Sequence, residues 1–272
     1  MSAIQFVKAQ ACGNDFLILE EAIAKGWHAQ LARTLCARHT GIGADGIEFL
    51  ERRADGSFFL RLFNADGSEA ELSGNGTRCV AAWLAESEGL QEVELGTHGG
   101  VRKCSVVLKE PNTPWWIQSG MGVPRVMPRS IEVEGVSGAV EGVMVNVGNP
   151  HFVIFPERED FGSHGMSWQE LGAKIAVAPL FKFGTNVEFV RVLKKDEIAF
   201  RIYERGCGPT TSSGTGTCAS SAAAITVHGV SRSLSALAEG GKQQVDWPSA
   251  TAEMLLTGPA EIVCSGEARV DF

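Results

Sequence analysis

The 272-residue sequence has no apolar run approaching the ~20 residues that a membrane-spanning helix needs. Its first residues, Met-Ser-Ala-Ile-Gln-Phe, lack the basic segment and apolar core of a secretory signal. Lys and Arg total 24 against 32 for Asp and Glu, and the net charge is −8. This acidic balance argues against nucleic acid or an anionic membrane surface as a main partner. We therefore expect a soluble, cytoplasmic protein.

The seven cysteines include no Cys-x2-Cys pair, so no structural metal site is expected. Their odd number, in a chain without an export signal, indicates reduced thiols rather than a disulfide framework. Hydrophobic residues make up 44% and charged residues 21% of the chain, which excludes a disordered protein. At about 150 residues per domain, the length predicts two domains.

Several short segments recur with one offset along the chain. Residues 61–64, 73–77 and 47–50 resemble segments 140 positions later (201 − 61 = 140), and the Gly-Asn pair at 13 recurs at 148. Strand and turn composition alone is a poor explanation for four matches at nearly one offset. We predict two similar halves, 1–115 and 116–263, related by a pseudo-twofold axis. A C-terminal strand at about 264–272 is expected to return to the first half.

Short β-branched and aromatic runs bounded by Gly, Pro, Asp or Asn predict strands, for example at 58–63, 104–108, 143–147 and 187–192. Helices are predicted at 28–39, 77–88, 168–176 and 217–227. The last is rich in Ala and Ser, so other elements can approach it closely, and we place it centrally. The predicted fold class is α+β, with each half a mostly antiparallel curved sheet around a central helix. The Pro-rich segment 111–128 is predicted to connect the halves.

Two Ser-Gly-x-Gly-Thr loops, beginning at Ser73 and Ser213, each follow a strand and open a helix. A helix N-terminus has about four N–H groups without internal partners and roughly +0.5 charge, so it binds carboxylates well. One such loop alone would more simply be a turn before a helix. Two at equivalent positions predict a cleft between the halves where both helix ends hold one ligand. Ser73 and Ser213 would then face one carbon from opposite sides, as stereochemical inversion requires.

These motifs, together with several others, resemble the signature set of the diaminopimelate epimerase family. The others are the segments at 11–16, 41–45, 63–69, 148–151 and 203–206. The resemblance implies a cofactor-independent isomerase of lysine and peptidoglycan precursor biosynthesis that interconverts LL- and meso-2,6-diaminopimelate. It also implies an active site in the cleft between two like halves, a small amino-acid substrate and a homodimer.

By position, the resemblance implies that His151 and Glu204 exchange protons with the acid/base pair at 73 and 213. It assigns the substrate contacts to Asn14, Asn64, Gly74, Asn75, Asn149, Asn186, Glu204, Arg205, Gly214 and Thr215. Arg205 suits a bidentate contact to the distal carboxylate of the substrate. Taken singly, any of these Asn residues would more simply be a turn or cap residue, and a lone His is more often structural.

The sequence departs from the family at the centre of the site. The family has a cysteine at the first position of each loop, where this chain has Ser73 and Ser213. A thiol at a helix N-terminus supplies a thiolate near neutral pH, whereas a serine hydroxyl needs a neighbouring base. We expect impaired epimerisation with fold and substrate binding retained, because the two side chains are nearly isosteric.

Several explanations of the serines remain open. Both thiols of an epimerase could have been replaced, or other groups, such as Cys12 and Cys207, could carry the protons. The chain could instead be a lyase or isomerase of related fold acting on another amino acid, or a homologue that only binds. Cys79 and Cys218 lie one turn inside the predicted helices, and we interpret them as packing residues.

Overall fold

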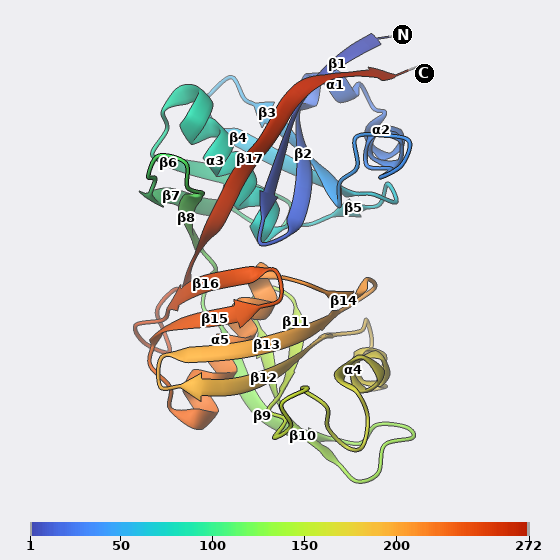
Figure 1. Ribbon diagram of the computed structural model, residues 1–272, viewed down its shortest axis with the longest axis vertical. Helices are drawn as coiled ribbons and strands as arrows, with labels where there is room; N and C mark the ends of the chain where they lie inside the picture. The colour runs from blue at the N-terminus through green and yellow to red at the C-terminus, as the bar shows by residue number, and fades with distance from the viewer. Residues whose placement is uncertain (1, 271–272) are drawn as a thin grey trace. The chain divides into compact units, whose positions relative to one another are not determined.

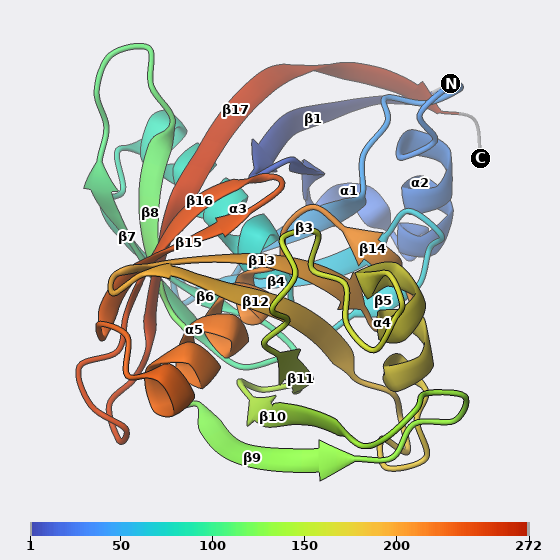
Figure 2. The same cartoon turned by 60° about the horizontal axis from the view of Figure 1, so that its bottom comes forward.

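The computed structural model describes residues 2–270, and the chain divides into two compact units. Unit 1 comprises the described residues up to Ser119 together with those from Thr257 onward, and unit 2 comprises Gly120–Leu256. Figure 1 labels the helices and strands, and Figure 2 shows the same ribbon from a second direction.

Unit 1 is mostly sheet. Its elements are β1 (Ser2–Ala11), β2 (Asn14–Glu20), α1 (Glu21–Ala24), α2 (His28–Leu35), β3 (Gly46–Arg52), β4 (Phe58–Asn64), β5 (Glu69–Ala70), α3 (Gly74–Glu88), β6 (Glu92–Gly96), β7 (Arg102–Leu108), β8 (Trp115–Gly120) and the returning β17 (Leu255–Val270). The first and last strands, β1 and β17, run antiparallel and side by side (Figures 1 and 2). Because β17 also pairs with β8, the strands of unit 1 form a closed ring.

Unit 2 repeats this plan. Its elements are β9 (Arg125–Ile131), β10 (Val140–Asn146), β11 (Pro150–Ile154), α4 (Trp168–Ala176), β12 (Asn186–Lys194), β13 (Glu197–Glu204), β14 (Gly208–Thr210), α5 (Gly214–His228), β15 (Ser233–Ala238) and β16 (Gly241–Asp246).

The strand pairings of the two units correspond one to one. In unit 1, β1–β2 is antiparallel, β2–β3 parallel, β3–β4 antiparallel, β4–β6 parallel and β6–β7 antiparallel. In unit 2, the pairs β10–β11, β11–β12, β12–β13, β13–β15 and β15–β16 follow the same sequence of directions. The internal repeat in the sequence therefore folds into two copies of one topology.

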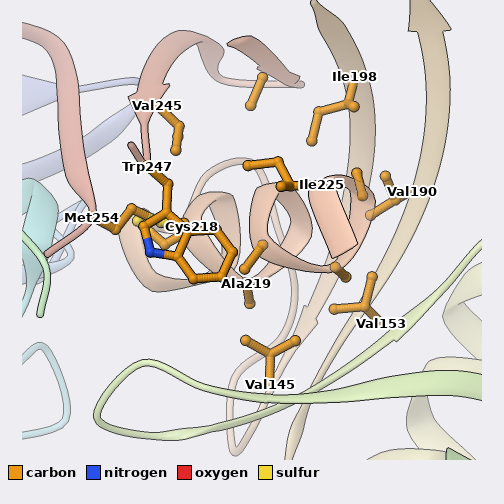
Figure 3. Packing of buried hydrophobic residues seen from close by; sticks show 14 of the residues in the cluster. Val145, Val153, Val190, Ile198, Cys218, Ala219, Ile225, Val245, Trp247 and Met254 are labelled. Atoms are coloured by element: carbon orange, nitrogen blue, oxygen red, sulfur yellow. The ribbon is translucent and has the colours of Figure 1, made fainter. Parts of the chain in front are cut away.

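A small-residue helix lies at the centre of unit 2. Helix α5 contacts β9, β10, β11, β12, β13, β15 and β16, so strands surround it. Its Ala and Ser side chains leave room for this close approach, and Cys218, Ala219 and Ala222 are completely buried. Figure 3 shows Val145, Val153, Val190, Ile198 and Trp247 gathered around the helix. Helix α3 occupies the corresponding core of unit 1.

Each central sheet strand separates two cores. On β12, Val187 and Phe189 pack in the core that includes α4, whereas Val190 packs in the core around α5. On β3, Ile47 and Phe49 face the core that includes α2, and Leu50 faces α3. This alternation is the period of two expected for a strand buried on both faces.

The predicted α+β class with a central helix is confirmed. The segment 111–128, predicted to connect the halves, contains the boundary between the units at Ser119 and Gly120, and it also forms β8 and the first part of β9. Its prolines and glycines suggested a linker, but the β-forming run Trp115-Trp116-Ile117 pairs with β7. The two Gly-rich loops also differ from expectation, since α3 and α5 begin at Gly74 and Gly214 rather than three residues later.

The enclosure of α5 gives a stability prediction. Replacing Ala222 by Leu should lower the free energy of unfolding by about 1–3 kcal/mol, because the extra atoms must displace surrounding strands. The matched change Val227→Leu lies on the same helix at a residue 46% exposed, and it should change stability by less than about 0.5 kcal/mol. Urea denaturation followed by circular dichroism measures both. Equal effects would contradict the close packing of α5.

Candidate functional site

Ser73 and Ser213 are the N-cap residues of the two central helices. The Oγ of Ser73 accepts a hydrogen bond from the N–H of Gly76 at 3.0 Å, and the Oγ of Ser213 accepts one from Gly216 at 3.2 Å. Both serines have the extended backbone conformation usual for this position. The two predicted loops are therefore equivalent helix caps with a hydroxyl at each N-terminus.

The first turn of each helix is suited to a carboxylate. Gly74 and Asn75 in α3, and Gly214 and Thr215 in α5, are the first two residues of their helices. Their N–H groups have no acceptor within the helix, and the helix dipole adds positive charge at the same point. A carboxylate at either N-terminus could accept two backbone hydrogen bonds beside a serine hydroxyl.

In unit 1, the predicted residues Asn14 and Asn75 form hydrogen bonds with each other and with Arg78 at the N-terminus of α3. The buried Asn75 donates from Nδ2 to Asn14 Oδ1 at 3.2 Å, and its Oδ1 accepts from Arg78 at 2.5 Å. Arg78 is fully buried and also donates to the Gly74 carbonyl at 3.2 Å. The structure thus links Asn14 and Asn75 and places a buried cation behind them.

An ion-pair network fixes the loop that carries Asn14. Asn14 donates to Asp45 at 2.6 Å, and Arg38 donates to both Asp45 and Asp15. Burial would raise the pKa of Asp15, but the hydrogen bonds and positive charges of Arg38 and Lys8 lower it overall. The Asp15 carboxylate therefore stays ionised, and its hydrogen bonds with Arg38, together with those of Asp45, hold the loop in one position.

In unit 2, hydrogen bonds connect Ser213 to a buried carboxyl group. Thr215 Oγ1 lies 3.4 Å from Ser213 Oγ and accepts from Asn149 Nδ2 at 3.4 Å. Asn149 Oδ1 lies 2.8 Å from His151 Nε2, and His151 Nδ1 lies 2.7 Å from Glu188 Oε1. If Asn149 Oδ1 accepts the Nε2 proton, a further proton lies between His151 and Glu188. The predicted residues Asn149, His151, Ser213 and Thr215 are thus brought together.

The remaining unit 2 residues adjoin this chain of hydrogen bonds. Asn186 is the register partner of His151 on the neighbouring strand. Its amide donates to the Pro150 carbonyl at 3.0 Å and accepts from the N–H of Arg205 at 2.9 Å. Glu204 accepts a hydrogen bond from Thr210 at 2.5 Å. The backbone of the β13–β14 turn is therefore tied to the strand beside His151.

A pocket of about 590 Å³ lies beside that turn. Arg205 and Lys182 line it together with Ala176 of α4, Phe183 before β12, Tyr203 of β13 and Cys207 of the turn. The Arg205 side chain is exposed and donates to the Phe183 carbonyl at 3.4 Å. The guanidinium group is thus available to a carboxylate at the border of this pocket.

Two buried glutamates were not singled out from the sequence. Glu48 and Glu188 are at most 1% exposed, and each lies on the face of its strand that meets the central helix. A Cβ at position 76 would overlap Glu48 Oε1, and one at position 216 would lie 3.1 Å from Glu188 Oε1. The signal was present in the repeat 47–50 and 187–190, where each apolar strand carries a glutamate at the second position.

Burial changes the protonation of these two carboxyl groups. It raises the pKa of Glu48 to about 8. It also raises the pKa of Glu188, although the charge and hydrogen bond of His151 oppose the shift. Glu48 Oε1 and Glu188 Oε2 have no hydrogen-bond partner within the described chain. Each central helix therefore has a buried carboxyl group of raised pKa against its first turn.

Other predicted residues lie apart from these clusters. Asn64 is exposed and donates to Ser68 in the turn that follows β4. Cys12 is buried, and Cys207 is exposed at the pocket border. Cys79 and Cys218 are completely buried, as expected for packing residues, and burial raises the pKa of Cys79.

The described residues contain neither a cluster of metal ligands nor a membrane-spanning helix. Over residues 2–270, no three or more His, Cys, Asp and Glu side chains are grouped as metal ligands would be. Within the same range, no helix combines the length and apolar character needed to cross a membrane.

Comparisons with known proteins point to one family. The family model for diaminopimelate epimerase matches residues 6–127 and 143–263. The chain is 33% identical to diaminopimelate epimerase 1 of Nostoc sp., over 97% of this chain and 99% of the relative. It is 34% identical to the diaminopimelate epimerase of Pelotomaculum thermopropionicum, over 97% and 98%.

Solved structures share the fold at low sequence identity. A Bacillus anthracis phenazine biosynthesis protein of the PhzF family is 16% identical with a TM-score of 0.77, covering 99% of this chain and all of that one. A hydroxyproline epimerase from Agrobacterium vitis, with bound trans-4-hydroxy-L-proline, is 14% identical with a TM-score of 0.71, covering 97% and 92%.

The raised pKa of Glu48 predicts a pH-dependent stability. The folded state retains a proton up to about pH 8, whereas the unfolded carboxyl releases it near its ordinary pKa of 4.5. The contribution of Glu48 to the free energy of unfolding is therefore fully present below the pKa of the unfolded state. It is lost as the pH rises through the pKa of the folded state. Relative to Glu48→Gln, the wild type should lose up to about 1.4 kcal/mol per pH unit in this window.

Denaturant unfolding of both proteins across this pH range measures the difference. The Glu94→Gln variant serves as the control, because it removes an exposed carboxyl group instead of a buried one. A constant difference between Glu48→Gln and the wild type would contradict a neutral buried Glu48.

Proposed function

The chain belongs to the diaminopimelate epimerase family, and from this premise we propose that it inverts the α-carbon of 2,6-diaminopimelate, interconverting the LL and meso forms. It is an amino-acid epimerase-like enzyme, an isomerase. The observation that carries the proposed substrate and mechanism is the pair of serine-capped helix N-termini at equivalent positions of a repeated fold.

The helix N-termini address the main difficulty of the reaction. An amino-acid α-proton is a very weak acid, and its removal places negative charge on the adjacent carboxylate. The N–H groups of Gly74, Asn75, Gly214 and Thr215 would stabilise that charge as it develops. Such preorganised donors contribute most when they are fixed before the reaction begins, as they are in the first turn of a packed helix.

Inversion requires one group on each face of the α-carbon. We assign these positions to Ser73 and Ser213. One oxygen accepts the α-proton from its face, and the other hydroxyl donates its proton to the opposite face. The proton count balances over the step, and the reverse reaction exchanges the two roles. No cofactor is required by this scheme.

The serines need bases, because a hydroxyl supplies no anion comparable to the family thiolate. For Ser213, we assign this role to His151, whose ring is held by hydrogen bonds with Glu188 and Asn149. Glu204 is assigned with His151 to proton exchange near the reacting centre. We expect turnover to be slower than in a cysteine-containing relative.

The distal amino-acid end of the substrate is assigned to polar groups beside the reacting site. Arg205 would hold the distal carboxylate, with Asn64, Asn149 and Asn186 as further contacts. The exposed guanidinium of Arg205 at the pocket border supports this assignment. The proposal extends to a cytoplasmic homodimer, which the family resemblance implies.

The first test follows the α-proton directly. Proton NMR of LL- and meso-diaminopimelate in D2O with this protein should show loss of the α-proton signal and interconversion of the two isomers. Cysteine in place of both serines, Ser73→Cys with Ser213→Cys, should raise the rate by less than tenfold if the buried carboxyl groups serve as bases. An increase of several orders of magnitude would contradict bases outside the two caps.

Binding without exchange would have a different meaning. Saturable binding of diaminopimelate with no loss of the α-proton signal would reject the epimerase and support a homologue that only binds. If the α-proton of another amino acid exchanges and that of diaminopimelate does not, the same site acts on a different substrate. Isothermal titration calorimetry with each amino acid supplies the binding measurement.

The role of Arg205 is tested separately. Arg205→Ala should weaken diaminopimelate binding by about 1.5–3 kcal/mol, because a charged hydrogen-bond partner of the distal carboxylate is lost. Lys182→Ala removes the other cation of the same pocket and is expected to change binding less than twofold. Should the two variants bind alike, the distal carboxylate is held elsewhere. Calorimetric titration gives both affinities.

A further inference from the structure

Glu48 lies at a fully buried position of β3, where an apolar residue would be expected. Its register partners are Ile18 on β2 and Leu62 on β4, and the same face of β3 carries Leu50. A carboxyl group among these side chains loses hydration, and an apolar residue of similar size would avoid this cost. Its presence therefore calls for a role other than packing.

The carboxyl group of Glu48 lies directly against the helix that Ser73 caps. Glu48 Oε1 contacts Gly76 so closely that any Cβ there would overlap it. The N–H of the same glycine donates to Ser73 Oγ at 3.0 Å. Glu48 and Ser73 therefore both contact one residue of the first turn. A glycine at position 76 is what permits this approach.

The equivalent carboxyl group in unit 2 has the same position but a different partner. Glu188 Oε1 and the Cβ of Ser213 each lie 3.1 Å from the point where a Cβ of residue 216 would be. Glu188 contacts His151 at 2.7 Å, whereas Glu48 Oε1 has no hydrogen-bond partner among the described residues. The two halves thus place a carboxyl group behind each capping serine, one paired with an imidazole and one unpaired.

We propose that Glu48 is the positioning base of unit 1, which exchanges a proton with Ser73 while Ser73 exchanges one with the substrate α-carbon. In one direction, the Ser73 oxygen takes the α-proton as the Glu48 carboxylate takes the hydroxyl proton. In the other, the neutral Glu48 returns a proton to the Ser73 oxygen as the hydroxyl proton passes to the carbon. In unit 2, Glu188 positions His151, and His151 exchanges the proton with Ser213. This inference rests on the proposed function.

The surroundings of Glu48 suit a group that changes protonation near neutral pH. Burial holds its pKa at about 8, so the neutral and ionised forms differ little in free energy there. Glu48 interacts electrostatically with the Cys79 thiol on α3.

The experiment uses the two glutamates as counterparts. In D2O, Glu48→Gln should lower isomer interconversion at least about 100-fold, yet still exchange the α-proton of the one isomer whose proton faces Ser213. Glu188→Gln should exchange only the other isomer. This opposite selectivity follows because each variant keeps one working face. The exposed Glu94→Gln variant should behave as the wild type does with both isomers.

Other outcomes overturn the inference. If Glu48→Gln loses exchange of both isomers in equal proportion while remaining folded by circular dichroism, Glu48 has only a structural role. If it keeps interconversion within threefold of the wild type, Ser73 uses another base. Both results leave the proposed epimerase standing, provided that the wild type interconverts the isomers.

Inactivity of the wild type would reject the proposed function instead, and titration then decides the role of Glu48. Carbon-13 NMR of protein labelled at the glutamate carboxyl should show one signal titrating near pH 8 that is absent from Glu48→Gln. Adding diaminopimelate should shift this titration if Glu48 communicates with the site. A signal with an ordinary carboxyl pKa, or one unaffected by ligand, would overturn Glu48 as a proton-exchanging group.

Discussion

A helix surrounded by strands can offer backbone hydrogen-bonding groups to a ligand only at its ends, and this constraint applies to the central helix of each unit. Seven strands of unit 2 contact α5, and its Ala and Ser residues allow their close approach. The unpaired N–H groups of the first turn are then the accessible polar part of the helix. Because the surrounding sheet fixes the helix axis, these donors are held in place before any ligand binds, which is the condition for strong electrostatic stabilisation.

The same enclosure explains the buried carboxyl groups. The strand that runs past each helix N-terminus carries a glutamate on the helix side, at Glu48 and Glu188. A glycine in the first turn, Gly76 or Gly216, allows the carboxyl to approach the helix. Low polarity around it raises its pKa towards neutrality. A cap, a glycine and a buried acid therefore form one repeated unit of structure, and unit 2 adds His151 to it.

The repeated arrangement of cap, glycine and buried acid explains how serines could replace cysteines at the two caps. A thiolate stabilised by a helix N-terminus needs no further base, whereas a hydroxyl does. The chain matches its diaminopimelate epimerase relatives over nearly their whole length and has serine at both caps. In the proposed mechanism, the unpaired carboxyl of Glu48 and the Glu188–His151 pair supply two different bases for the two equivalent hydroxyls. Such asymmetry fits a reaction whose forward and reverse directions remove protons from opposite faces.

The sequence by itself determined the repeat, the fold class, the two helix caps and the family resemblance. These follow from local patterns: residue spacing, turn residues and short motifs carry their information within a few positions. Only the tertiary structure decided that Glu48 lies against Gly76, that His151 joins Glu188 to Asn149, and that Arg78 is buried behind Asn75. It also decided that 111–128 forms strands, because pairing with β7 outweighs its prolines and glycines. Contacts and burial depend on residues distant in the chain, and a pKa depends on both. None of the three can therefore be obtained from the local pattern alone.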